Sequence, residues 1–362
     1  MTTNRNSLST TPYDSGARRL PLLVAALGLS LALQTSAATS MLRAQDSQDA
    51  RTLARQAWQA VDDFRRGGGQ DQDPEHPGAR FGPRLWEVAQ SLPEGEDRHK
   101  AGEEAVHLMV HAGRFEAIDQ WLSGLAASDP IWEAVLNRLP EAGSHLEGNR
   151  MATRQLKRLK QAGKDGLAVP ISRIDFVLFR LLRTAGYGQE AQALALSLIK
   201  EHPDSEAAHT LRGFSQRDGL LQPGDPVPPF KMPTVDDGQL SSDSLRGKVL
   251  LVDFWSTTCG ICLQEMPTIR AIEERLGEKG FQVMGVAFDQ DPQAVLRAVE
   301  SKKAEWPQVL ASESDGLPGK LGASGTPYYV LIDRQGRVAA PGIGIHFVES
   351  RVQELLNQSA DE

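Results

Sequence analysis

The chain has 362 residues, of which 24% are charged and 40% are hydrophobic, and its formal net charge is −8 at pH 7. This length predicts two or three domains. The acidic balance argues against a nucleic-acid surface, which requires clustered Lys and Arg, so we expect no nucleic-acid partner. No segment after the N-terminal region approaches the roughly 20 apolar residues that span a bilayer.

The N-terminal segment has the composition of a secretory signal peptide. The basic pair Arg18-Arg19 precedes an apolar run over residues 20–33, and small residues follow at 35–38. We therefore predict that residues 1–44 direct export to the periplasm or another extracytoplasmic compartment. The long polar lead before Arg18 leaves a second interpretation open, in which the segment is not cleaved and anchors the protein in a membrane. No Cys follows the apolar run, which argues against a lipoprotein anchor.

Residues 46–215 are predicted to form an all-α domain. Apolar residues recur at helical spacing over residues 46–66, and the pattern from Phe81 to Phe214 is helical without strand-like alternation. The glycines at 67–69 and the polar, proline-bearing tract to Pro77 predict a loop between these parts.

Part of this region repeats. Gly113 and Gly186 each sit in an Ala-Gly turn and precede a proline by 17 residues, and the two glycines are 73 residues apart. The second unit resembles a tetratricopeptide repeat, and such repeats offer a concave face to other proteins. A protein partner on this region and a plain helical bundle that only supports the C-terminal domain are both open interpretations.

His107 and His111 lie four residues apart on a predicted helix, after Glu103 and Glu104. This spacing can ligate a metal, but no third His lies nearby and the HExxH order is absent. We interpret the pair as a partly exposed helix face and predict no metal site.

A cluster of Gly and Pro over residues 213–229 predicts the boundary of a C-terminal domain, residues 221–362. The pattern beyond it predicts alternating strands and helices, followed by a hairpin and a last helix. The expected elements are a strand over 248–254, a helix over 259–276, a strand over 281–288, a helix over 291–301, hairpin strands over 328–333 and 337–340, and a helix over 348–356.

The only two cysteines of the chain, Cys259 and Cys262, stand where the strand over 248–254 leads into the helix. The backbone N–H groups and dipole of a first helical turn favour an anion, so the first thiol should ionise easily and attack a disulfide. A structural zinc site usually needs a second cysteine pair, which this chain lacks, and a disulfide closing so short a loop would stabilise little. The pattern therefore favours a redox-active dithiol over a structural site.

These residues resemble a known family. Residues 251–262 read LVDFWSTTCGIC, Gly325-Thr326-Pro327 follows later, and the segments at 224–230, 245–248 and 330–338 complete the pattern. Together they resemble the extracytoplasmic thiol–disulfide reductases of the TlpA/ResA type, which help to mature c-type cytochromes. The resemblance covers roughly residues 220–360 and implies an α/β thioredoxin-like fold, with a central mixed sheet flanked by helices. Thr258, in place of an aromatic residue, and the dipeptide Gly260-Ile261 depart from the common pattern.

Two carboxylates are candidates for proton handling. Asp253 lies six residues before Cys259 in an apolar strand, where burial should raise its pKa unless it reaches solvent at an edge. The resemblance implies that Asp253 accepts the proton of Cys262. Glu265 follows Cys262 by one helical turn. The resemblance implies that Glu265 tunes the cysteine pKa values, although a solvated helix carboxylate is an open alternative.

The resemblance also implies a substrate surface beside the dithiol. It predicts a cis peptide bond between Thr326 and Pro327, lying against the cysteines, with the Thr326 backbone available to pair with a substrate strand. We also expect Trp255, Gly260 and Ile261 to contact the substrate, since they neighbour the cysteines in sequence.

The predicted function is thiol–disulfide exchange on protein substrates, most readily as a reductase. Cys259 would attack, Cys262 would resolve the mixed disulfide, and the pair would cycle through a Cys259–Cys262 disulfide with no other cofactor. An oxidising compartment also calls for a donor that reduces the pair, so we expect a membrane-linked electron donor. Two alternatives remain: a peroxiredoxin-like peroxide reductase, although Val252 stands where its motif has proline, and a helical-repeat binding scaffold with a secondary redox centre.

Overall fold

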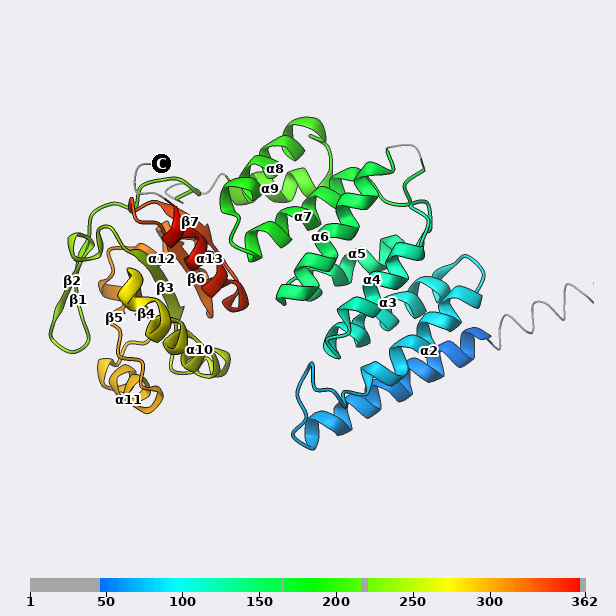
Figure 1. The fold of residues 1–362 in the computed structure, drawn as a ribbon, viewed down its shortest axis with the longest axis horizontal. Coiled ribbons are helices and arrows are strands. Elements are labelled where there is room, and N and C mark those ends of the chain that lie inside the picture. Colours follow the sequence, from blue (N-terminus) through cyan, green and yellow to red (C-terminus); the bar gives the residue numbers. More distant parts are fainter. Residues whose placement is uncertain (1–45, 164–165, 216–220, 359–362) are drawn as a thin grey trace, which may run out of the picture.

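The computed structural model describes residues 46–163, 166–215 and 221–358. The predicted signal segment, residues 1–44, lies outside the described residues. A helical region is followed by an α/β domain, and the two lie beside each other (Figure 1).

The helical region is a succession of short helices joined by tight turns. A helix covers residues 46–66, as the apolar spacing predicts. It is followed by α2 (Gly78–Ser91), α3 (Glu96–His111), α4 (Phe115–Gly124), α5 (Ile131–Ala142), α6 (Leu146–Gln161), α7 (Ile171–Thr184), α8 (Gly188–Glu201) and α9 (Glu206–Ser215).

The two repeated glycines occupy equivalent turns. Gly113 follows the C-cap residue of α3 with φ 64°, and Gly186 follows that of α7 with φ 83°, a left-handed conformation that suits glycine. The turn between α5 and α6 lies between these two in sequence, but its glycine, Gly143, has φ −63° and needs no left-handed conformation. This turn therefore lacks the signature of the other two, which explains why the sequence did not reveal it. The tetratricopeptide interpretation stays a prediction.

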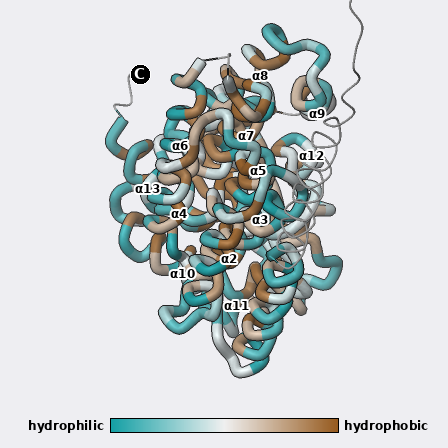
Figure 2. Tube along the Cα trace, turned by 90° about the vertical axis from the view of Figure 1, so that its right-hand side faces the viewer, coloured by the Kyte–Doolittle hydropathy of each residue, from teal (hydrophilic) through white to brown (hydrophobic). Residues whose placement is uncertain are grey.

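One apolar core runs through most of the helical region. It includes the fully buried side chains of Leu85, Trp132 and Leu136. Figure 2 shows hydrophobic segments in the interior and hydrophilic ones on the outer turns. Among the described residues, no helix combines the length and the apolar character needed to cross a membrane.

The C-terminal domain is built on a mixed five-stranded sheet in the order β5-β4-β3-β6-β7. β3 (Val249–Trp255) pairs in parallel with β4 (Phe281–Ala287), which pairs in parallel with β5 (Gln308–Leu310). β6 (Tyr328–Ile332) is antiparallel to both β3 and β7 (Val338–Pro341). This is the thioredoxin-like α/β arrangement that the sequence predicts. The sequence did not reveal β5, the small hairpin of β1 (Lys231–Pro233) and β2 (Gln239–Ser241), or α12 (Leu317–Lys320).

The sheet has a packed layer on each face. α10 (Gly260–Leu276) and α13 (Ile345–Asn357) share one apolar core with alternate β3 residues such as Leu251 and Trp255, and α11 (Pro292–Lys302) joins that core. The β1–β2 hairpin and α12 share the other core with Val252 and Phe254. β3 is consequently buried along its whole length.

The helical region contacts the α/β domain at the turn between α7 and α8. Thr184 O accepts a hydrogen bond from Gly344 N at 2.8 Å, and Gly186 O accepts one from Arg351 Nε at 3.1 Å. Ala185 is buried in the same core as α10 and α13. The two regions therefore share a small packed interface in addition to the connecting chain.

Candidate active site

The two cysteines lie at the start of α10, immediately after the loop that leaves β3. Cys259 is the N-cap residue of α10, and its Sγ accepts a hydrogen bond from Cys262 N at 3.2 Å. The two sulfur atoms form a disulfide with an S–S distance of 2.05 Å. Cys259 is partly exposed, whereas Cys262 is 2% exposed and packs in the core beneath α10. The first sulfur is thus the one that a partner can reach.

The loop before Cys259 is held by a residue that the sequence analysis missed. Asp289, just beyond β4, accepts hydrogen bonds from Thr257 N at 3.0 Å and from Thr257 Oγ1. Phe288 N also donates to Trp255 O at 2.9 Å. These contacts join the ends of two neighbouring parallel strands and fix the path of the chain into α10. An Asp two residues after an apolar strand gives no sequence signal of this role.

Asp253 lies inside the sheet, not at an edge. It is 1% exposed. It lies two residues from both Leu251 and Trp255, so its side chain is on the same face of β3 as theirs, the face that α10 covers. Its Oδ1 has no hydrogen-bond partner among the described residues. Burial, with a smaller contribution from the charge of Glu265, raises the pKa of Asp253 to about 8. A carboxyl group with this pKa can exchange a proton near neutral pH.

Glu265 is tied to the same position by Tyr329, which the sequence analysis did not single out. Tyr329 stands directly opposite Asp253 in the β3–β6 pair, and its hydroxyl donates to Glu265 Oε2 at 2.6 Å. Burial and the neighbouring carboxylates raise the pKa of Tyr329 far above its usual value, so the phenol keeps its proton and remains a donor. The structure therefore brings Asp253, Glu265 and Tyr329 together as one polar group at the apolar core that also contains Cys262.

The peptide bond between Thr326 and Pro327 is cis, as predicted. β6 begins one residue later, and its register pairs Tyr328 with Phe254 near the end of β3. Pro327 is therefore at the same end of the sheet as the loop that leads into Cys259. Thr326 and Pro327 are both partly exposed.

Three large apolar side chains are exposed among the described residues, and two of them lie near the dithiol. Ile261, between the cysteines, is 58% exposed, and Phe288 is 41% exposed beside the loop that precedes Cys259. Gly260 is also exposed. Trp255 is different: it is fully buried and donates its indole N–H to Gln308 Oε1 at 2.9 Å. The expectation that Trp255 contacts a substrate is therefore corrected, because its side chain supports the sheet from within.

These features define a class of protein: a thioredoxin-fold oxidoreductase whose Cys-x-x-Cys pair caps the helix after the central strand. The Redoxin family model matches residues 222–355. The thiol:disulfide interchange protein DsbE of Pseudomonas aeruginosa is 33% identical over 126 residues, 34% of this chain and 67% of that protein. The thiol-disulfide oxidoreductase ResA of Bacillus thuringiensis is 27% identical over 133 residues, 37% of this chain and 76% of that protein.

The chain belongs to the DsbE/ResA family of thiol–disulfide oxidoreductases, and its C-terminal domain carries the matched part. Among solved structures, the thioredoxin domain of a thiol-disulfide oxidoreductase from Bacteroides vulgatus is 27% identical. The aligned part covers 38% of this chain and 99% of that structure, with a TM-score of 0.34.

Proposed function

We propose that this protein reduces disulfide bonds of exported proteins, with Cys259 as nucleophile and Cys262 as resolving thiol. The observation that carries the proposal is the position of the two sulfurs. Cys259 is partly exposed, and its Sγ accepts a hydrogen bond from the Cys262 N–H in the first helical turn. Cys262 is buried behind it. A thiolate at Cys259 is stabilised by that N–H and by the helix dipole.

The reaction would proceed in two exchanges. The Cys259 thiolate attacks one sulfur of a substrate disulfide, a Cys259–substrate disulfide forms, and the other substrate sulfur leaves as a thiolate. Cys262 then loses its proton to the carboxylate of Asp253 and attacks Cys259 Sγ. This step releases the second substrate thiolate and leaves the Cys259–Cys262 disulfide, so the substrate gains two electrons. Glu265, held by Tyr329, would set the charge near Asp253.

The substrate would dock as an extended segment over Ile261, Phe288 and the Thr326–Pro327 bond. The two exposed side chains supply apolar contact, and the Thr326 backbone supplies hydrogen-bonding groups at the start of β6. Restoring the dithiol requires a reductant, for which a membrane-linked dithiol donor is the proposed source. Extracytoplasmic location is supported by the predicted signal segment, and a disulfide of an apocytochrome c is a proposed substrate by resemblance.

The test is reduction of a model protein disulfide, such as insulin, by the reduced full-length protein. We expect stoichiometric transfer of two electrons by the wild type and none by Cys259→Ser. A matched control is Ser256→Ala, which keeps both thiols. Equal reduction by wild type and Cys259→Ser would contradict the proposal.

A further inference from the structure

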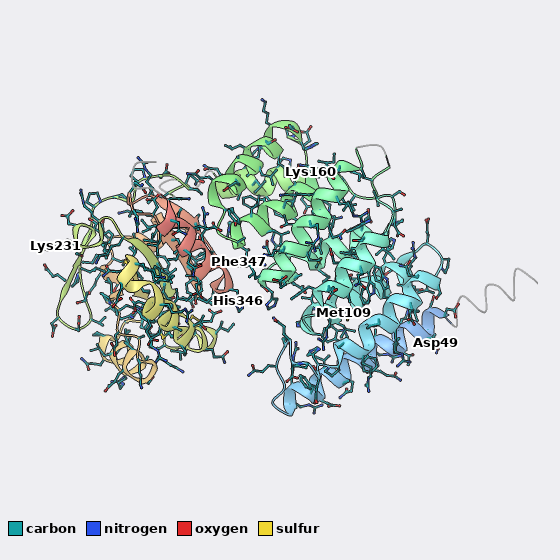
Figure 3. The ribbon with its side chains drawn as sticks, in the orientation of Figure 1. Asp49, Met109, Lys160, Lys231, His346 and Phe347 are labelled. Atoms are coloured by element: carbon teal, nitrogen blue, oxygen red, sulfur yellow. A yellow bond between two sulfur atoms is a disulfide. The ribbon has the colours of Figure 1, made fainter. Side chains whose placement is uncertain are left out.

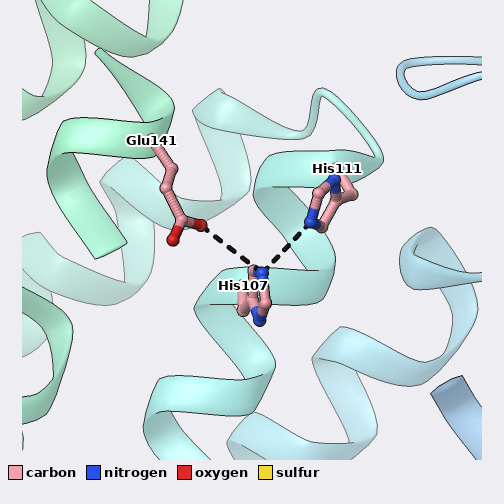
Figure 4. Close-up of side chains that lie close together, drawn as sticks. All are labelled: His107, His111 and Glu141. Atoms are coloured by element: carbon pink, nitrogen blue, oxygen red, sulfur yellow. Dashed lines mark hydrogen bonds and ion pairs between the residues drawn. The ribbon is translucent and has the colours of Figure 1, made fainter. Parts of the chain in front are cut away.

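A second site lies in the helical region, on helices other than the one that carries the cysteines. It consists of His107 and His111 on α3 and Glu141 on α5, whose donor atoms all lie within 4.8 Å of one another (Figure 4). His107 Nε2 lies 3.1 Å from His111 Nε2 and 3.4 Å from Glu141 Oε2. The sequence indicated only the two histidines, for which we expected no metal site; Glu141 comes from another helix and adds the third candidate ligand.

We propose that His107, His111 and Glu141 bind a divalent transition-metal ion, with Zn²⁺ as the expected occupant. Two imidazole nitrogens at about 2.0–2.1 Å from one tetrahedral zinc ion are roughly 3.3 Å apart, close to the observed 3.1 Å between the two Nε2 atoms. The Glu141 oxygen is at a comparable distance from His107 Nε2. Glu141 is exposed, so its side chain can rotate to close the remaining separation from His111.

One of the two histidines has the carboxylate partner that is common behind ligating histidines. His111 Nδ1 lies 2.7 Å from Asp71 Oδ2, which holds the ring with Nε2 directed at His107. Behind His107, Nδ1 is 3.9 Å from Glu104 Oε2 and has no hydrogen-bond partner among the described residues. A carboxylate in the position of Asp71 orients a ligating histidine, whereas Glu104 lies too far from His107 to form a hydrogen bond with it.

Nearby cations do not occupy the metal-facing atoms. Arg138 Nη1 binds Glu141 Oε1 at 2.9 Å, which leaves Oε2 on the side of His107. Arg65 approaches His111 Nδ1 at 3.3 Å and pairs with Asp71 at 2.9 Å. Glu103, Glu104, Glu141 and Asp71 together outnumber these two arginines, so the local charge is negative and suits a divalent cation.

The type and number of the ligands indicate which metal the site would bind. Two imidazoles and a carboxylate are borderline donors, which suit zinc better than calcium or magnesium. Three protein ligands leave a fourth position for water. Because the ligands come from two helices that α4 separates in the sequence, bound metal would join α3 to α5 and should stabilise the helical region.

The test is calorimetric titration of Zn²⁺ into the full-length protein with the Cys259–Cys262 disulfide closed, so that no thiol is available. We expect one Zn²⁺ per chain. Asp71→Asn should weaken binding about 10–100-fold, and His111→Ala or His107→Ala should weaken it by more than that. Glu103→Gln is the matched control for Glu141→Gln, because both residues contact Arg138 but only Glu141 faces the histidines. The control should bind Zn²⁺ as the wild type does.

X-ray absorption of the wild-type zinc complex gives a readout that needs no variant. We expect nitrogen and oxygen neighbours at about 2.0–2.2 Å, with imidazole scattering from two histidines and no sulfur near 2.3 Å. The proposal is overturned if the wild type binds no Zn²⁺, if folded His111→Ala binds it equally well, or if the absorption spectrum shows no histidine ligands.

Discussion

Replacing Asp253 by Asn should stabilise the oxidised protein, increasingly so as the pH rises. The carboxyl group is 1% exposed, and its pKa rises from 3.8 to about 8 on folding, chiefly through burial. Between these two values the unfolded chain has lost the proton while the folded protein keeps it, so the stability of the wild type falls as the pH rises. Each pH unit in that window costs about 1.4 kcal/mol. From pH 5 to pH 8 the loss is therefore roughly 4 kcal/mol, and Asp253→Asn should not show it.

The assay is denaturant unfolding of both forms at several pH values between 5 and 8.5, followed at the α/β domain. The difference in unfolding free energy between the variant and the wild type should grow with pH and level off above pH 8. Asp243→Asn, at an exposed carboxylate, is the control and should leave the pH dependence unchanged. A difference that stays constant from pH 5 to pH 8 would refute the claim that Asp253 is buried as a neutral acid.

The same substitution should slow the second exchange reaction while leaving the first intact. Without the carboxylate, Cys262 lacks its proton acceptor, so mixed disulfides should accumulate and resolution should slow about 100-fold at pH 7. The wild-type resolution rate should rise with pH up to about 8, following ionisation of Asp253. Equal rates for both forms across pH 6–9 would make Asp253 a structural residue and Glu265 the better candidate for proton transfer.

Three further predictions concern the dithiol and its domain. In the reduced protein at mildly acidic pH, iodoacetamide should label Cys259 before Cys262, as read by peptide mass spectrometry; the opposite order would reverse their roles. A fragment of residues 221–362 should fold alone with a cooperative thermal transition, since the chain from Leu221 onward bonds to the sheet domain, and aggregation without a transition would contradict this. Phe288→Ser should raise the KM for a protein disulfide about tenfold through lost apolar contact, without changing the rate with a small disulfide. An unchanged KM would remove Phe288 from the substrate surface.

The sequence predicted the parts of the site that depend on local patterns. The apolar run of β3, the helical spacing after Cys262 and the hairpin around Gly336 are each encoded within a few residues, and the structure has all three. The cis bond at Thr326–Pro327 followed from the resemblance and is present. The edges of the predicted elements differ from the observed ones by only a few residues in most cases.

The sequence did not predict features that depend on partners distant in the chain. β5 has three residues, too few to show a period, and it belongs to the sheet only because β4 lies beside it. Trp255 lies only four residues before Cys259, yet its side chain donates a hydrogen bond to Gln308, 53 residues away, in the core. Tyr329 and Glu141 were missed for the same reason, since each meets its site from another element.

The contact between the helical region and the α/β domain also involves residues that are distant in the sequence. His346 lies at the start of α13, the helix of the α/β domain nearest the helical region (Figure 3), and its ring centroid is 5.6 Å from that of His145. These residues are 201 positions apart, and neither lies in a pattern that marks a contact surface.

The central claim, that Cys259 is the nucleophile of a thiol–disulfide reductase, is tested most directly by trapping the mixed disulfide. Reduced Cys262→Ser protein is incubated with a protein disulfide substrate, quenched with acid and alkylating agent, and mapped by mass spectrometry. We predict a covalent adduct through Cys259 that a reductant releases, and no adduct with Cys259→Ser under the same conditions. An adduct that forms through Cys262 in Cys259→Ser, with none through Cys259 in Cys262→Ser, would contradict the account.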